Sequence, residues 1–199
     1  IAILASGSGS NAENIVQHFK NHQEISVSCI VCNRREAKVF ERAKKLQIPS
    51  YYFPKTDFYQ TDKVLRLIKE EADWIVLAGF LLKIPQNILN VFPNNIINIH
   101  PALLPKFGGK GMYGHHVHAA VAEAGELESG MTVHWVNADY DEGDILFQAS
   151  CQLEAGDTPE TIGAKVLTLE HRYYADVLEH VIRESVAQSG EKPRILKEI

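Results

Sequence analysis

The first eleven residues, IAILASGSGSN (1–11), decide the class of fold. A short apolar run leads into a loop of alternating glycine and serine, and a helical pattern covers residues 11–21. Glycines let the backbone turn sharply and approach a ligand closely, and the N–H groups at the start of a helix attract anions. This strand–loop–helix unit predicts an α/β fold with a phosphate site in the loop. A tight turn that binds no ligand is the alternative.

The same loop matches the pattern G-x-G-x-x-A through Gly7, Gly9 and Ala12, which is typical of dinucleotide-binding folds. An NAD site needs an acidic residue near the end of the second strand, whereas this chain has Arg34 and Arg35 there, which would suit NADP. A Walker A loop is excluded because no Gly-Lys-Ser/Thr follows. The loop alone therefore leaves an NADP-dependent oxidoreductase and a non-catalytic nucleotide-sensing module open.

Apolar runs alternate with helical patterns along the first two thirds of the chain. We expect strands at residues 1–5, 25–32, 49–53, 74–78 and 96–99, and helices at 11–21, 34–46 and 57–71. Such an alternation indicates a parallel sheet that is covered on both faces. Residues 130–137 and 145–153 predict an antiparallel hairpin, and Thr158-Pro159-Glu160 predicts the start of a final helix that extends to about residue 186. The sequence thus predicts a three-layer, Rossmann-like α/β fold with a mostly parallel sheet and an antiparallel C-terminal portion.

The chain has 199 residues, a mass of 22.3 kDa and a formal net charge of −5. This size fits one domain, which we place at residues 1–187, with a polar tail at 188–199. No basic excess indicates nucleic-acid binding, and no apolar run approaches the roughly 20 residues that span a bilayer. The three cysteines show no pairing pattern, which favours a reducing, cytoplasmic setting. We expect Cys29 and Cys32 to be buried because they lie in an apolar run.

The segment NIHP (98–101) closes the apolar strand at residues 96–99. Asn98 and His100 are two residues apart, so both side chains leave the same face of that strand. An amide donor and a titratable imidazole at the carboxyl end of a strand suit an active site in an α/β sheet. Pro101 ends the strand and fixes the direction in which the chain leaves it. A buried pair that only satisfies backbone groups is the alternative.

The other histidines and the acidic turn raise the question of a metal. His115, His116 and His118 would spread around the first turn of a helix instead of converging on one ion. The turn DYDEGD (139–144) fails the EF-hand pattern, because its fifth position is Gly143 and its twelfth is Ser150. We therefore predict no metal site.

Five motifs together resemble the folate-dependent formyltransferases, from residue 3 to about residue 173. They are GSGSN (7–11), LAGF (77–80), NIHPALLP (98–105), GMTVH (130–134) and DYDEG (139–143). The resemblance implies a formyltransferase fold and transfer of a formyl group from 10-formyltetrahydrofolate, a co-substrate, to the amine of glycinamide ribonucleotide. It also implies a cytoplasmic enzyme of purine synthesis that acts on small molecules, as a monomer or weak homodimer, with no nucleic acid, membrane or metal involved.

The resemblance also assigns residues. The family's catalytic asparagine, histidine and aspartate map to Asn98, His100 and Asp141. Its binding sites map to Gly9, Ser10, Asn11, Gly79, Pro101 and Glu170 for the ribonucleotide, with Glu170 at the ribose, and to Phe80, Leu81, Leu82, Lys83, Ala138 and Asp139 for the folate. This chain departs from the family in two places: Leu81-Leu82 replaces the common Met-Arg, and the segment at 107–113 is longer and rich in glycine.

The chemistry of formyl transfer fits this catalytic set. The attacking amine forms a tetrahedral intermediate, and each hydrogen-bond donor aimed at its oxyanion lowers the barrier by roughly 3–4 kcal/mol. We expect Asn98 and a protonated His100 to be these donors. Asp141 would favour the imidazolium and take the proton that the amine loses.

Overall fold

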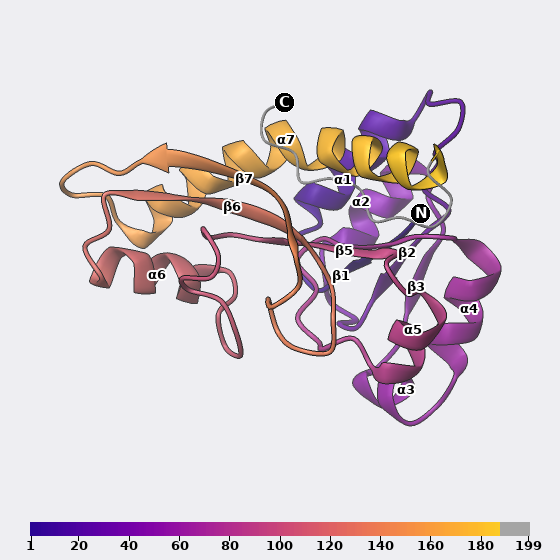
Figure 1. Ribbon diagram of the computed structural model, residues 1–199. Coiled ribbons are helices and arrows are strands. Elements are labelled where there is room, and N and C mark those ends of the chain that lie inside the picture. Colours follow the sequence, from indigo (N-terminus) through magenta and orange to yellow (C-terminus); the bar gives the residue numbers. More distant parts are fainter. Residues whose placement is uncertain (188–199) are drawn as a thin grey trace. The chain divides into compact units, whose positions relative to one another are not determined.

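The computed structural model describes residues 1–187, so the predicted tail at 188–199 lies outside the described residues. Fourteen elements follow one another along these described residues (Figure 1). They are β1 (Ala2–Ala5), α1 (Ser10–Phe19), β2 (Cys29–Cys32), α2 (Val39–Leu46), β3 (Ser50–Tyr52), α3 (Lys55–Tyr59), α4 (Lys63–Glu71), β4 (Ile75–Leu77), α5 (Gln86–Val91), β5 (Ile96–His100), α6 (His115–Glu123), β6 (Glu128–Trp135), β7 (Ile145–Gln152) and α7 (Pro159–Ala187).

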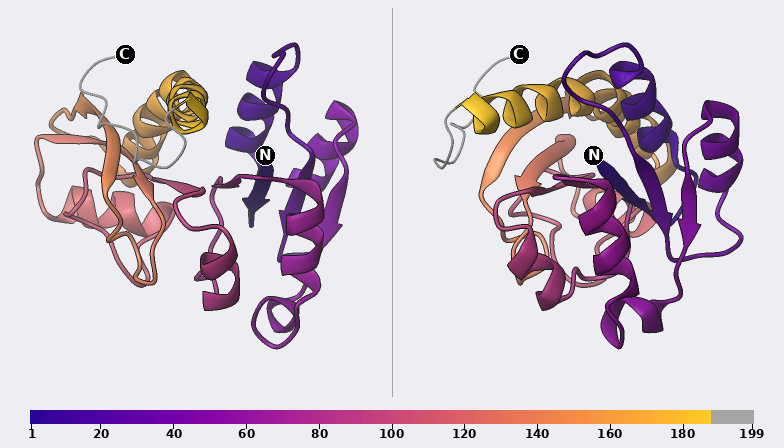
Figure 2. Two further views of the ribbon diagram at one scale, coloured as in Figure 1. Left: turned by 45° about the vertical axis from the view of Figure 1, so that its right-hand side comes forward. Right: turned by 90° about the vertical axis from the view of Figure 1, so that its right-hand side faces the viewer.

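Two compact units divide the chain, Ile1–Ile97 and the part from Asn98 onward. In the first unit, β1 pairs in parallel with β2 and β4, and β2 pairs in parallel with β3. Helices α1 and α2 contact each other on one side of these strands, and α3 and α4 lie on the other side (Figures 1 and 2). Every residue of β1, β2 and β4 is buried, as expected for parallel strands covered on both faces.

Helix α4 begins later than the periodicity predicts, because the expected helix at residues 57–71 is broken. The hydroxyl of Thr61 donates to the carbonyl of Asp57 (3.0 Å), and the N–H of Lys63 donates to the same hydroxyl (3.3 Å). These local bonds replace the helical ladder between α3 and α4. The expected strand at 25–32 and helix at 34–46 also begin later, at Cys29 and Val39, and α5 was not predicted.

The second unit is built on the antiparallel hairpin of β6 and β7, which confirms the predicted change of character. Helix α7 contacts both strands and α6 (Figure 1). Its start is capped as the sequence predicts: the N–H of Thr158 donates to the hydroxyl of Thr161 (2.9 Å), and the N–H of Thr161 approaches the hydroxyl of Thr158 (3.4 Å). Gly130 in β6 allows close pairing, because a Cβ there would lie 2.1 Å from the carbonyl oxygen of Ala149.

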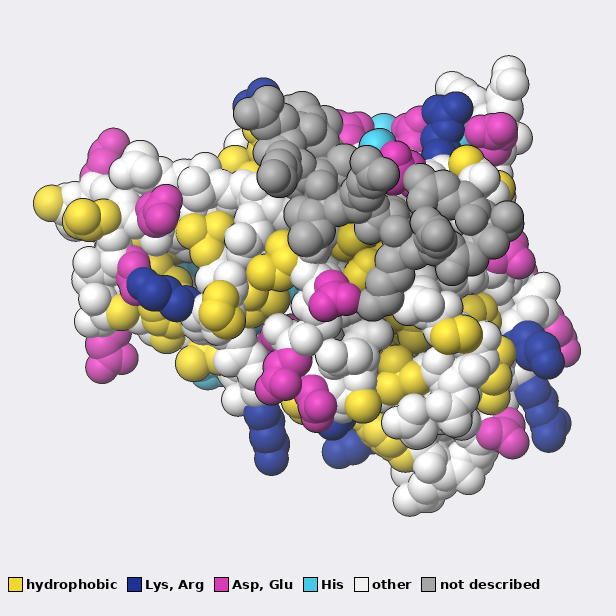
Figure 3. Space-filling view, viewed as in Figure 1, with side chains coloured by type: hydrophobic (Ala, Val, Ile, Leu, Met, Phe, Trp, Pro, Cys, Tyr) yellow, Lys and Arg dark blue, Asp and Glu magenta, His cyan; other side chains and the backbone are white. Residues whose placement is uncertain are grey.

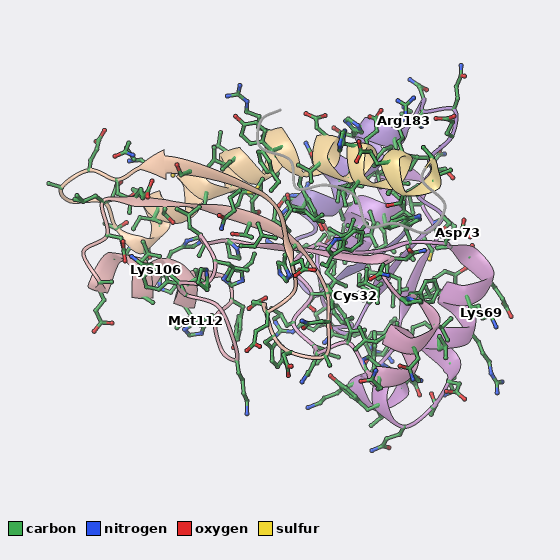
Figure 4. The ribbon with its side chains drawn as sticks, viewed as in Figure 1. Cys32, Lys69, Asp73, Lys106, Met112 and Arg183 are labelled. Atoms are coloured by element: carbon green, nitrogen blue, oxygen red, sulfur yellow. The ribbon has the colours of Figure 1, made fainter. Side chains whose placement is uncertain are left out.

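The seven strands hydrogen-bond in the order β3-β2-β1-β4-β5-β6-β7, with β5 spanning the boundary between the two units. This mostly parallel sheet with its antiparallel C-terminal strands confirms the predicted fold class. The single domain stays a prediction. Cys29 and Cys32 are buried free thiols, as expected; Cys32 is labelled in Figure 4. Within residues 1–187, no helix has the length and apolar character required to span a bilayer.

Candidate active site

The carboxyl end of β5 carries the two residues predicted from the NIHP segment. His100 is 3% exposed and Asn98 is half-buried. The chain that follows is held by Thr132 of β6, whose hydroxyl donates to the carbonyl of Ala102 (2.6 Å) and accepts the N–H of Leu104 (3.0 Å). Pro101, a predicted ribonucleotide contact, lies at the start of this fixed segment. The exit from β5 is therefore set by buried hydrogen bonds as well as by the proline.

His134 of β6 is a site residue that the sequence analysis did not identify. Its Nδ1 lies 2.8 Å from the carbonyl oxygen of Trp135, and its Nε2 lies 3.0 Å from the amide nitrogen of Asn98. A carbonyl only accepts, so Nδ1 carries a proton, and in the tautomer that has only this proton Nε2 accepts from Asn98. This contact fixes the orientation of the Asn98 amide and leaves a second N–H on the same nitrogen.

His100 and Asp141 face each other within the second unit. Nε2 of His100 donates to the carbonyl oxygen of Phe107 (2.8 Å), so in the neutral ring the lone pair is on Nδ1. That Nδ1 lies 3.5 Å from one carboxylate oxygen of Asp141. The other carboxylate oxygen lies 3.6 Å from Nε2 of His134. Asp141 thus lies between two buried imidazoles.

The surroundings shift the pKa values of both groups. Burial lowers the pKa of His100 below its ordinary value of 6.5, although Asp141 and the Phe107 carbonyl act in the opposite direction. Burial by itself would raise the pKa of Asp141, but His134, His100 and the N–H of Gly109 outweigh it and hold this pKa below 3.8. The resting pair at neutral pH is therefore a neutral imidazole beside a carboxylate. This differs from the protonated His100 that we expected as a second oxyanion donor, because burial favours the neutral ring and the Phe107 carbonyl already accepts from Nε2.

Three further histidines, His115, His116 and His118, lie on α6. His118 is 9% exposed, and its Nδ1 has no hydrogen-bond partner. Burial lowers its pKa, and His115 and His100 add to this effect. Among residues 1–187, no three histidine, cysteine or acidic side chains are grouped so that they could hold an ion.

The glycine-rich loop lies in the first unit and caps α1. Gly9 adopts φ +76°, and a Cβ on it would lie 2.5 Å from a side-chain methyl of Val39 at the start of α2. Arg42 of α2 donates from Nε to the carbonyl oxygen of Ser8 (2.9 Å) and forms a salt bridge with Glu13. The loop is therefore fixed from α2, and the N–H groups at the start of α1, the helix that begins Ser10-Asn11, are held in place.

The predicted folate loop at 79–83, also in the first unit, is anchored on Ser6. The Ser6 hydroxyl donates to the side-chain oxygen of Asn33 (2.5 Å) and accepts the N–H of Leu81 (2.9 Å). The N–H of Ser6 donates to the carbonyl of Gly79, which adopts φ +71°. At the other end, the hydroxyl of Tyr59 donates to the carbonyl of Lys83 (2.8 Å). Phe80 packs on Phe58, and Leu82 is half-buried.

The other predicted contacts lie in the second unit. Glu170 is on α7 and 8% exposed. Ala138 and Asp139 are exposed in the turn between β6 and β7, where the N–H of Asp139 donates to the side-chain oxygen of Asn137 (2.9 Å). Each unit therefore contains part of the predicted site residues.

Comparison with known proteins identifies the class to which this fold and this histidine–aspartate cluster belong. Residues 1–178 match the family described as formyl transferase, and the chain belongs to that family. The resemblance inferred from the five motifs is confirmed.

Within the family, the chain is similar to several proteins named phosphoribosylglycinamide formyltransferase. The enzyme of Bacillus subtilis (strain 168) is 35% identical over 197 residues, which cover 96% of this chain and 97% of the relative. The chloroplastic enzymes of Arabidopsis thaliana and Vigna unguiculata are 40% and 39% identical; each alignment covers 94% of this chain, but only 66% and 62% of the respective relative. The crystal structure of the Bacillus halodurans enzyme, 34% identical, covers 92% of this chain and 95% of its own with a TM-score of 0.82.

Proposed function

We propose that this chain transfers the formyl group of 10-formyltetrahydrofolate to the primary amine of glycinamide ribonucleotide, a step in the synthesis of purine nucleotides (IMP). The observation that carries the proposal is a cluster of four side chains joined by contacts of 3.0 to 3.6 Å: Asn98, His100, His134 and Asp141. This cluster lies in a chain that belongs to the formyl transferase family. The printed names of the relatives support glycinamide ribonucleotide as the acceptor.

The reaction needs one oxyanion donor and one proton acceptor. The amine nitrogen attacks the formyl carbon and forms a new N–C bond, and the formyl oxygen becomes an oxyanion. The bond from the carbon to N10 of the folate then breaks. Asn98 donates its second N–H to the oxyanion, which lowers the barrier by roughly 3–4 kcal/mol. No covalent enzyme intermediate is required.

The proton that the amine loses goes to the His100–Asp141 pair. His100 presents a bare Nδ1 to Asp141, so the incoming proton settles between the two groups and creates an imidazolium beside the carboxylate. The same proton then passes to N10 as the folate leaves. His100 thus becomes cationic during the reaction, after starting from the neutral ring that its burial favours.

Both substrates have proposed binding residues. The phosphate of the ribonucleotide binds to Gly9, Ser10 and Asn11 at the start of α1, which offers N–H groups and a positive dipole end. Gly79, Pro101 and Glu170 contact the rest of this substrate, with Glu170 at the ribose.

The reduced folate is the co-substrate. We propose that it binds to Phe80, Leu81, Leu82, Lys83, Ala138 and Asp139. Clamping of the 79–83 loop by Ser6 and Tyr59 supports a preformed binding surface, which reduces the entropy cost of binding.

A coupled assay tests the proposal. Protein is mixed with glycinamide ribonucleotide and 10-formyl-5,8-dideazafolate, and loss of the formyl group is followed by absorbance. Turnover should require the nucleotide and collapse in Asp141→Asn and His100→Ala, while His115→Ala, an exposed histidine of α6, should retain it. Loss of the formyl group without the nucleotide would mean a hydrolase, and an inert native protein would refute the assignment.

We also propose that the enzyme works in the cytoplasm as a monomer or weak homodimer. The three free cysteines support a reducing compartment. On the face shown in Figure 3, Lys and Arg side chains are interspersed with Asp and Glu side chains, and the formal net charge is −5. Both observations support small-molecule substrates over a polyanion.

A further inference from the structure

The segment that follows the NIHPALLP motif contacts both members of the proton-accepting pair. The carbonyl of Phe107 accepts from Nε2 of His100 (2.8 Å), and the N–H of Gly109 donates to a carboxylate oxygen of Asp141 (2.9 Å). These backbone groups are two residues apart, so one short piece of chain holds two side chains that come from β5 and from the turn after β6.

The backbone of this segment is strained. Phe107 adopts φ +56° and Gly109 φ +97°, and Asp141 itself adopts φ +57°. A positive φ is uncommon outside glycine and persists where the surrounding structure enforces it. Such conformations cluster at functional sites, which points to a role for the backbone here beyond joining β5 to α6.

Packing also fixes the segment against the pair. A Cβ on Gly108 would lie 2.6 Å from a methyl of Leu104, which would have to move, and in van der Waals contact with the Cβ of Asp141 at 3.4 Å. The N–H of Met112 donates to the carbonyl of Gly109 (3.1 Å) and closes the turn. Lys106 and Met112, labelled in Figure 4, flank the segment on either side.

We propose that residues 107–109 are a positioning segment for proton transfer: the Phe107 carbonyl selects the tautomer of His100 whose Nδ1 is bare, and the Gly109 N–H holds the carboxylate of Asp141 opposite that nitrogen. The inference rests on the proposed function for the identity of the proton, which moves from the amine nitrogen to the His100–Asp141 pair and then to N10 of the folate. The positioning itself rests only on the geometry.

The charged and titratable groups near the His100–Asp141 pair determine the pH at which the pair changes its protonation state. Asp141 lies close to His100 and His134. The charge of His134 lowers the pKa of His100, and the charge of His100 in turn lowers the pKa of His118 of α6. The Gly109 N–H is one of the contacts that lower the pKa of Asp141. Its loss should therefore raise the pH at which activity falls on the acidic side.

Two glycines of the same stretch provide a matched test. Gly109 and Gly111 adopt φ +97° and +92°, and a Cβ on either would have no atom within 4 Å. Alanine should therefore strain both positions to a similar degree. Only Gly109 donates to Asp141. Alanine keeps the backbone N–H, but it disfavours the positive φ at residue 109, and relief of that strain would turn the N–H away from Asp141. Gly109→Ala should therefore lose about tenfold in kcat and shift the acidic limb of the pH profile upward by about one unit, as expected for a lost charge-assisted bond. Gly111→Ala should keep both values.

Nitrogen-15 NMR of the histidine rings gives a readout that needs no turnover. Native protein and Gly111→Ala should show His100 protonated at Nε2 and bare at Nδ1 near neutral pH. A native His100 protonated at Nδ1 would overturn the proposal, even if formyl transfer were confirmed. Equal acidic limbs in the two alanine variants would overturn it as well. Conversely, the expected tautomer in a protein without formyl transfer would refute the proposed function and leave the positioning intact.

Discussion

Replacement of Ser6 by alanine should remove one of the hydrogen bonds that anchor the folate loop at 79–83. The Ser6 side chain is 1% exposed, and its hydroxyl makes two bonds, to Asn33 and to the N–H of Leu81. Each lost bond costs about 1 kcal/mol, because Asn33 and Leu81 are half-buried and water can partly replace the hydroxyl. Ser6→Ala should therefore lower the free energy of unfolding by about 2 kcal/mol and Tm by roughly 4–8 °C.

The functional effect of this change should fall on one substrate. The bond from Leu81 to Ser6 is part of what holds the loop in its ordered conformation. A loss of about 1 kcal/mol there corresponds to roughly a fivefold rise in KM for the folate donor. KM for glycinamide ribonucleotide should stay unchanged, because the bond from the Ser6 N–H to Gly79 and the contacts of Gly9 with Val39 and of Ser8 with Arg42 remain.

Ser28→Ala is the control for this experiment. The Ser28 hydroxyl makes one bond, to the carbonyl of Ile1 (3.0 Å), and that carbonyl also accepts the N–H of Ser28. Its removal should cost no more than about 1 kcal/mol and leave both KM values unchanged. Urea unfolding and steady-state kinetics on both variants decide the matter. If Ser6→Ala is no less stable than Ser28→Ala, or if both KM values rise together, the assignment of Ser6 as the anchor of the folate loop is wrong.

Three further predictions concern the proton-accepting cluster. Asp141→Asn should reduce kcat by about 10²–10⁴-fold with little change in either KM, measured by single-turnover kinetics, because the amide cannot take the proton. The folded state should lose stability as the pH falls below about 6.5, because the pKa of His100 is lowered on folding and the unfolded chain therefore binds more protons. The lowered pKa of Asp141 adds a further loss when the pH falls below about 4. The urea midpoint of the native protein should be lower at pH 5.5 than at pH 7.5, and this difference should be smaller in His100→Gln. The same difference in both proteins would contradict this prediction. His134→Phe should lower kcat about tenfold, since Asn98 loses the acceptor that orients its amide, whereas His134→Gln, which keeps an acceptor, should restore part of the rate.

The order of the strands and of most helices was predictable from the sequence because apolar runs and helical periodicity report burial directly, whereas the short helix α5 was not predicted. The prediction failed at Thr61, where a side chain competes with the backbone. The hydroxyl of Thr61 ends α3 through two bonds that no periodicity signals, so one expected helix became two. The hairpin of β6 and β7 was predicted correctly, and all residues of β6 after Glu128 are buried.

His134 shows why part of the candidate site could not be predicted. A histidine in a strand that is buried on both faces is more often a satisfied core residue than a site residue, and His134 does bond to the carbonyl of Trp135. That bond gives the ring its role, since a proton fixed on Nδ1 makes Nε2 an acceptor for Asn98. The Phe107 carbonyl acts on His100 in the same way and leaves Nδ1 bare toward Asp141. A motif can specify which side chains are present, but here two backbone carbonyls decide which nitrogen carries the proton. The position of those carbonyls depends on the folded path of the chain, which only the structure provides.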